Sequence, residues 1–232
     1  MTWLLASVRD LAEAELAWAG GAELVDLKDP DRGALGAWPA IELHRAVARL
    51  GARAVLSATT GDLPMEPAGL VAAARATAAS GVAYVKLGFF KGGDHAACAQ
   101  ALAAVAADGA RLVAVLMADQ GPDLGLLPRL AAAGFAGVML DTADKGRGGL
   151  RRHLDAATLA RFVAQAQAVG LLCGLAGSLT LADIPALAAL GPDYLGFRGA
   201  LCHGDRTGAL DPAALAEVRH RLAATAGTQP SC

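Results

Sequence analysis

Lysine is rare in this chain, and its positions suggest chemistry. Only four of the twenty cationic side chains are lysines. Three of them, Lys28, Lys86 and Lys145, lie at or just past the end of an apolar run that is typical of a β-strand. A lysine amine can lose its proton, attack a carbonyl and form a Schiff base, whereas a guanidinium stays charged. These three lysines are therefore candidate nucleophiles and proton carriers.

Two aspartates accompany these lysines. Asp26 precedes Lys28 by two residues in AELVDLK, which places both side chains on one face of a strand. Asp141 ends another apolar run, four residues before Lys145. A lysine of ordinary pKa is only roughly 0.04% free amine at pH 7, so a catalytic lysine needs cationic neighbours or burial to lower its pKa. The aspartates would then balance charge and transfer protons. The alternative is that each lysine only forms an ion pair with its nearby aspartate.

Two glycine-rich segments predict an anion site. The first contains Gly177 and Ser178, and the second contains Arg198, Gly199 and Ala200. Glycines let backbone N–H groups approach phosphate oxygens, and a helix N-terminus adds a favourable field. An arginine in the same place can add a bidentate contact. We expect these segments to bind the phosphate of a substrate.

The elements that must position these residues alternate regularly. Apolar strand patterns alternate with Ala-rich helical patterns, eight of each. The predicted strands span 3–7, 23–28, 53–58, 82–88, 111–117, 136–141, 171–175 and 193–197. The predicted helices span 9–19, 38–50, 67–79, 94–107, 123–133, 155–169, 180–189 and 212–224.

This alternation predicts an α/β fold with a parallel sheet, and eight complete units favour a single closed (β/α)₈ TIM barrel over residues 1–232. An open doubly wound sheet would have a GxGxxG turn after the first strand, where Ser7-Val8-Arg9 stands instead. Residues 225–232 are expected to form a frayed tail. In such barrels the carboxyl ends of the strands carry the chemistry, and alternate strands contribute to one layer. The lysines and aspartates follow strands two, four and six, so we expect them to converge.

Composition excludes several classes of protein. The net charge is −2 without a basic stripe, which argues against a nucleic-acid partner. The four cysteines lack CxxC spacing, and neither they nor the histidines form a metal set, so no metal or cofactor is expected. No signal peptide or membrane span is apparent, which predicts a cytoplasmic protein. Ala-rich helices are compatible with a homo-oligomer. Asp62 is interpreted as a turn-forming residue.

Five separated motifs carry a resemblance to a known family. They are DLKDPDRGALGA (26–37), YVKLG (84–88), MLDTADKGRGGL (139–150), LAGSLTLADIP (175–185) and GFRGALCHGDR (196–206). In this order they resemble the (5-formylfuran-3-yl)methyl phosphate synthases of methanofuran biosynthesis, the route to a one-carbon carrier. That family is a (β/α)₈ barrel that condenses two glyceraldehyde 3-phosphate molecules, with loss of phosphate and water.

The resemblance implies roles for individual residues. Lys28 would form the Schiff base and Lys86 would accept a proton, with Asp26, Asp141 and Lys145 as supporting acid–base groups. The chain would be a carbon–oxygen lyase that acts on a triose phosphate. Two alternatives remain open at this point. One is a Schiff-base aldolase acting on another phosphorylated aldehyde, and the other is a non-catalytic barrel that binds a sugar phosphate.

Overall fold

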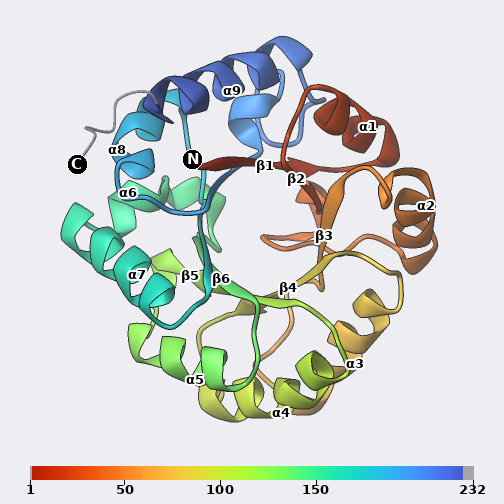
Figure 1. Ribbon diagram of the computed structural model, residues 1–232, viewed down its shortest axis with the longest axis vertical. Coiled ribbons are helices and arrows are strands. Elements are labelled where there is room, and N and C mark those ends of the chain that lie inside the picture. The colour runs from red at the N-terminus through yellow and green to blue at the C-terminus, as the bar shows by residue number, and fades with distance from the viewer. Residues whose placement is uncertain (1, 227–232) are drawn as a thin grey trace.

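The computed structural model describes residues 2–226 and contains one closed barrel of eight parallel strands. Neighbouring strands in the chain pair in order, and β8 pairs with β1 to close the ring. Figure 1 shows the helices as an outer ring around these strands. The strands are β1 (Trp3–Val8), β2 (Leu24–Leu27), β3 (Val55–Thr59), β4 (Tyr84–Phe89), β5 (Leu112–Met117), β6 (Gly137–Asp141), β7 (Leu172–Leu175) and β8 (Tyr194–Phe197).

Helices connect successive strands and cover the outside of the barrel. They are α1 (Leu11–Ala19), α2 (Ala40–Leu50), α3 (Pro67–Ala78), α4 (His95–Ala107), α5 (Leu127–Ala132), α6 (Leu150–His153), α7 (Ala156–Ala168), α8 (Ile184–Ala188) and α9 (Pro212–Ala226). Short 3₁₀ helices add turns in the loops, among them Lys145–Arg147, Leu181–Asp183 and Gly199–Leu201. After α8, the last helix α9 returns beside α1 and completes the ring.

Apolar side chains form two separate cores. The larger core lies between the strands and the helices, and it includes Leu4, Val25 and Phe162. The smaller core fills the inside of the barrel with residues such as Leu24 and Tyr194. Because successive side chains of a strand point to opposite faces, most strands contribute to both cores, for example β1 with Leu4 outside and Leu5 inside. The barrel interior is thereby closed below the polar residues of the mouth.

The predicted TIM barrel is confirmed, and all eight predicted strands exist. The boundaries differ most at β3 and β4, which each begin two residues later and end one residue later than predicted. Lys86 lies within β4. Helix α8 is shorter than predicted because Leu181–Asp183 forms a 3₁₀ turn. Helix α9 runs to Ala226, two residues into the predicted tail. The rest of that tail, 227–232, lies outside the described residues.

Candidate active site

The deepest charged pair joins two neighbouring even strands. Lys86 Nζ lies 2.9 Å from Asp26 Oδ2, and both side chains are almost fully buried, at 2% and 0% exposure. Strand register aligns Ser7 and Ser57 with Asp26 on either side. Their hydroxyls donate to the Asp26 carboxylate at 3.0 and 2.6 Å. The carboxylate therefore accepts hydrogen bonds from three donors, and it fixes the position of the Lys86 amine.

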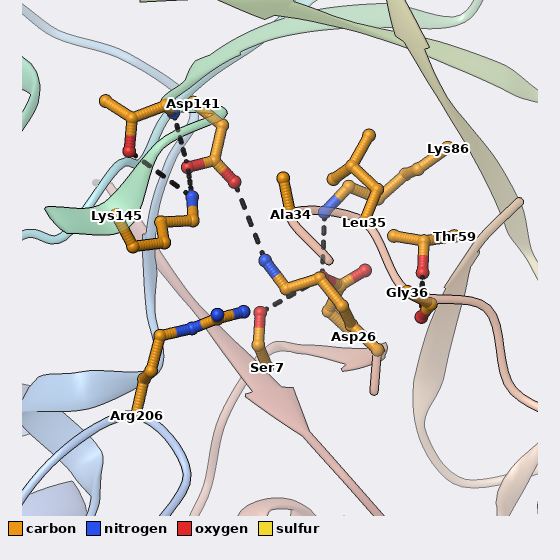
Figure 2. A network of polar contacts seen from close by, with 12 residues as sticks. Ser7, Asp26, Ala34, Leu35, Gly36, Thr59, Lys86, Asp141, Lys145 and Arg206 are labelled. Carbon is orange, nitrogen blue, oxygen red and sulfur yellow. Dashed lines mark hydrogen bonds and ion pairs between the residues drawn. The ribbon is translucent and has the colours of Figure 1, made fainter. Parts of the chain in front are cut away.

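A second cluster lies nearer the mouth around Asp141. Lys145 Nζ contacts Asp141 Oδ1 at 2.5 Å, and Thr142 N donates to the same oxygen at 2.7 Å. Lys28 Nζ lies 3.5 Å from the other oxygen, Oδ2. In Figure 2 the side chains of Lys145 and Lys86 extend toward Asp141 and Asp26, respectively. The structure thus brings together all five residues that were expected to converge from the even strands.

Burial and neighbouring charges set the protonation of these groups. Burial alone would raise the pKa of Asp26, but Lys86, Lys28 and the Ser57 hydrogen bond outweigh it and leave this pKa below its ordinary value. The pKa of Asp141 is lowered in the same way by Lys145 and Lys28. Burial lowers the pKa of Lys86, against the attraction of Asp26.

Lys145 follows the same pattern as Lys86. Burial lowers the pKa of Lys145, Asp141 opposes this effect, and the charges of Lys28 and Arg206 reinforce it. The aspartates are therefore held as carboxylates. Two of the lysines are shifted toward the free amine, which is the form that can accept a proton.

A cavity of about 630 Å³ opens directly above these groups, a volume typical of small-molecule sites. Lys28, Lys86, Asp141 and Lys145 line it on one side. The loops after β7 and β8 line the other side, including the predicted anion-binding residues Gly177, Ser178, Arg198, Gly199 and Ala200. One space therefore joins the amines to the glycine-rich loops.

The loop after β7 turns sharply and leaves backbone N–H groups without protein partners. Gly177 and Ser178 have consecutive positive φ angles of 105° and 48°. The Gly177 carbonyl accepts a bond from Leu150 N, and a Cβ at Gly149 would lie 3.0 Å from the Ser178 oxygen. Within residues 2–226, the N–H groups of Gly177, Ser178 and Gly199 have no protein acceptor. These three donors remain for a ligand.

Arg198 is engaged differently from the expectation. Its guanidinium forms a buried ion pair with Glu13 of α1. It also donates to the backbone oxygens of Ser7, Arg206 and Gly208. These contacts use all five of its N–H donors. Arg198 therefore anchors the loop after β8, and a bidentate phosphate contact from it would require these bonds to break.

Several residues at the mouth were not predicted from the sequence. Ser7 and Ser57 lie within apolar runs and became apparent only from strand register. Asp62, interpreted as a turn residue, accepts bonds from the N–H groups of Ala34 and Leu35 and so holds the loop after β2. Arg206 lines the cavity, and its presence in the quoted motif GFRGALCHGDR was the available signal.

Within residues 2–226, no group of three or more His, Cys, Asp or Glu side chains is arranged to hold a metal ion. None of the helices in the described part of the chain has the length and apolar character needed to span a membrane.

A closed (β/α)₈ barrel with amines and carboxylates converging at the carboxyl ends of its strands defines a TIM-barrel enzyme. Sequence comparison identifies its family. Residues 4–219 match the family model described as 4-HFC-P synthase, and the chain belongs to this family.

Individual relatives cover nearly the whole chain. A protein of Methylorubrum extorquens is 49% identical over 93% of this chain and 89% of its own length. The (5-formylfuran-3-yl)methyl phosphate synthase of Methanococcus maripaludis strain C7 is 35% identical over 88% of this chain and 91% of its own length. The synthase of the same name from Methanocaldococcus jannaschii is 34% identical over 87% of this chain and 90% of its own length.

Solved structures show the same fold at low identity. The 3-hexulose-6-phosphate synthase of Salmonella typhimurium has a TM-score of 0.68 and 13% identity, with 97% of this chain and 100% of that chain covered. Phosphoribosyl anthranilate isomerase of Thermus thermophilus has a TM-score of 0.66 and 18% identity, with 97% and 99% covered. At these identities the comparison concerns the barrel alone.

Proposed function

We propose that this enzyme condenses two molecules of glyceraldehyde 3-phosphate into (5-formylfuran-3-yl)methyl phosphate, with loss of one phosphate and two waters. The family model and the names of the methanogen relatives support this product. The furan would then serve methanofuran biosynthesis. The cavity at the barrel mouth joins candidate amines to candidate phosphate donors, which is the combination that a triose phosphate needs.

The observation that carries a Schiff-base mechanism is the environment of Lys28. Its amine lines the cavity, and its nearest carboxylate oxygen is 3.5 Å away. Lys86 and Lys145 contact carboxylates at 2.9 and 2.5 Å, within or below the normal range for charge-assisted hydrogen bonds. Lys28 is thus the least restrained amine of the three and has cationic groups around it. We assign it as the nucleophile.

The remaining groups would move protons. The Lys28 amine adds to the carbonyl of one triose and water leaves, which forms the imine. Lys86 then takes a proton from the adjacent carbon, and the electron pair of that C–H bond gives an enamine. The enamine carbon bonds to the carbonyl carbon of the second triose. Lys145 in its ammonium form would protonate the new alkoxide, and the Asp141 carboxylate would accept protons during the later loss of phosphate and water.

The phosphate of the first triose would bind the loops after β7 and β8. The N–H groups of Gly177, Ser178 and Gly199 have no protein acceptor among the described residues and line the same cavity as Lys28. Backbone donors bind an anion without adding a full charge next to the lysines. Arg198 would contribute through the loop that it anchors rather than through direct contact.

Borohydride trapping tests this assignment. Reduction in the presence of glyceraldehyde 3-phosphate should fix a covalent adduct on Lys28, located by peptide mass spectrometry, and no adduct should form without the triose. Lys28→Arg keeps the charge but cannot form an imine, so furan formation should fall by about 1,000-fold or more. The exposed Lys91→Arg is the matched control and should behave like the wild type.

Product analysis distinguishes the proposed reaction from its alternative. The furan aldehyde absorbs in the ultraviolet, whereas a simple aldolase acting on another phosphorylated aldehyde would give retro-aldol turnover and no such chromophore. An adduct on Lys86 or Lys145 instead of Lys28 would contradict the assignment of the nucleophile. Full activity in Lys28→Arg would contradict the Schiff-base mechanism itself.

A further inference from the structure

The barrel mouth contains a second cavity that the scheme above does not use. This cavity of about 770 Å³ lies over the loops that follow β2 to β6, on the other side of the mouth from the glycine-rich loops. Its lining includes Gly33, Asp62, Gln120 and Asp144. Lys145 and Arg206 line both cavities, so the two spaces meet at these two cations.

Arg206 is well placed to bind an anion at this junction. It belongs to the loop between β8 and α9, and its Nη2 donates to the Gly33 carbonyl of the loop after β2 at 3.0 Å. Among the described residues this is the only hydrogen bond of its side chain, so four of its five N–H donors stay available. Figure 2 shows its guanidinium directed toward the group of Ser7, Asp141 and Lys145.

The acidic residues of this cavity form no ion pair with Arg206 within residues 2–226. Both oxygens of Asp62 accept from the N–H groups of Ala34 and Leu35. Asp144 accepts from Gly146 N. These carboxylates hold the loops that form the cavity wall. Arg206 forms no salt bridge within residues 2–226, whereas Lys145 is paired with Asp141.

We propose that Arg206, together with Lys145, binds the phosphate of the second triose in this second cavity. The inference rests on the proposed function, because only a reaction of two triose phosphates needs two phosphate sites. Two phosphates in one site would repel each other strongly, while separate sites would bring the two reacting carbons together between them, beside Lys28. One site offers backbone N–H groups and the other offers two cations.

Comparing the first binding step with the whole reaction tests this role. In Arg206→Gln, the glyceraldehyde 3-phosphate concentration that half-saturates borohydride trapping on Lys28 should stay within about twofold of wild type. The value of kcat/KM for furan formation should fall by roughly 10- to 150-fold, the range expected for loss of a charged hydrogen bond. Arg206→Lys keeps the charge and should recover part of the activity. Arg147→Gln, an exposed arginine that lines neither cavity, is the matched control.

Two results would overturn the inference. Equal losses in trapping and in furan formation would mean that Arg206 only supports the loop or binds the first triose. Wild-type kinetics in Arg206→Gln would mean that it binds no substrate phosphate.

A crystal soaked in inorganic phosphate separates this inference from the proposed function. The wild type should bind one phosphate at the loops after β7 and β8 and another at Arg206 and Lys145, and Arg206→Gln should lose only the second. If the wild type makes no furan, the proposed function fails, yet the soak still decides whether the second anion site exists. Absence of phosphate at Arg206 in the wild type would refute the inference even if furan is formed.

Discussion

Asp26 is a buried carboxylate whose charge has hydrogen-bond partners and which also acts on the neighbouring Lys86 amine. It is completely buried, and it accepts hydrogen bonds from Lys86, Ser7 and Ser57. Removing one partner of a buried pair leaves the other charge uncompensated, at a typical cost of about 3–5 kcal/mol. Lys86 can reduce this cost by releasing its proton, since burial already lowers its pKa. Asp26 therefore controls both the position of this amine and its proton affinity.

Asp26→Asn should make Lys86 more acidic. The amide oxygen still accepts from one of the two serine hydroxyls, but the neutral side chain no longer attracts the ammonium, so the pKa of Lys86 should fall further. If the free amine of Lys86 accepts the substrate proton, the acidic limb of the kcat/KM profile should move to lower pH. The measurement is the pH profile of furan formation in the variant and in wild type. A limb displaced to higher pH would contradict this role for Lys86.

The same substitution should change stability in a pH-dependent way. At pH 7 the variant should lose about 3 kcal/mol of unfolding free energy. The folded pKa of Lys86 should be lower in the variant than in the wild type. Between these two values only the folded variant has lost the proton, so its deficit relative to wild type should shrink as pH rises. Urea denaturation at pH 7 and pH 9 measures the difference. Asp144→Asn, on an exposed turn, should show a small and pH-independent effect.

At the residue scale, sequence predicted which side chains converge but not how they pair. The sequence assigns Lys28, Lys86 and Lys145 to the ends of even-numbered strands or to the loops after them. This assignment was enough to group the lysines with the two aspartates. Asp26, however, pairs with Lys86, 60 residues away, while Lys28 faces Asp141 of β6. Pairing depends on strand register and on the depth of each side chain in the barrel. Neither quantity can be read from local spacing.

At the element scale, one ion pair determines the shape of the loop after β8. Arg198 lies at the end of β8 and Glu13 in α1, and both side chains are at least nine-tenths buried. Glu13 also accepts from the N–H groups of Arg9 and Leu210. The pair therefore fixes both ends of the loop that carries Gly199 and Arg206. Phosphate donors on this loop depend on it indirectly.

Arg198→Met should destabilise the protein rather than only weaken substrate binding. It leaves Glu13 buried without its cation, so the unfolding free energy should fall by about 3 kcal/mol in urea denaturation. Adding Glu13→Met removes the uncompensated carboxylate and should recover part of this loss. Arg221→Met, which breaks the exposed pair with Glu217, should change stability by less than about 1 kcal/mol.

A different result would restore the direct role first expected of Arg198. Unchanged stability of Arg198→Met, combined with a raised KM for glyceraldehyde 3-phosphate, would mean that its guanidinium contacts substrate. The sequence favoured that role because Arg198 stands among glycines after β8. Its partner Glu13 is 185 residues away and belongs to a helix pattern, so nothing local revealed the pair.

Whole elements were more predictable than loops for a physical reason. Strand and helix patterns extend over several residues and repeat eight times, so errors at single positions cancel. Caps such as Asp155, which accepts from Thr158 N, follow from the residue type alone. Helix α6 and the 3₁₀ turn Lys145–Arg147 depend instead on contacts between loops, for example Leu150 N with the Gly177 carbonyl.

At the scale of the whole molecule, the closed barrel buries ionisable groups that respond to pH in opposite directions. Asp26 and Asp141 have lowered pKa values, so their stabilisation is present above their unfolded pKa of about 3.9 and is lost as pH falls through the folded values. Cys173 of β7 behaves in the other sense. Burial raises the pKa of its thiol to about 12, with Asp193 adding to the effect. Its contribution is complete below about 8.5, the unfolded value, and declines as pH rises toward 12.

Cys173→Ala should therefore flatten the alkaline limb of the stability profile. From pH 8 to pH 10 the unfolded thiol ionises while the folded one does not, which costs the wild type about 2 kcal/mol that the variant does not lose. The stability difference between wild type and variant should shrink by that amount, as measured by urea denaturation under reducing conditions. Val163→Ala also creates a buried cavity but removes no titrating group, so its difference from wild type should stay constant with pH. A Cys173→Ala difference that is equally constant would mean that the folded thiol ionises as readily as the unfolded one, and that the packing around β7 opens to solvent in this pH range.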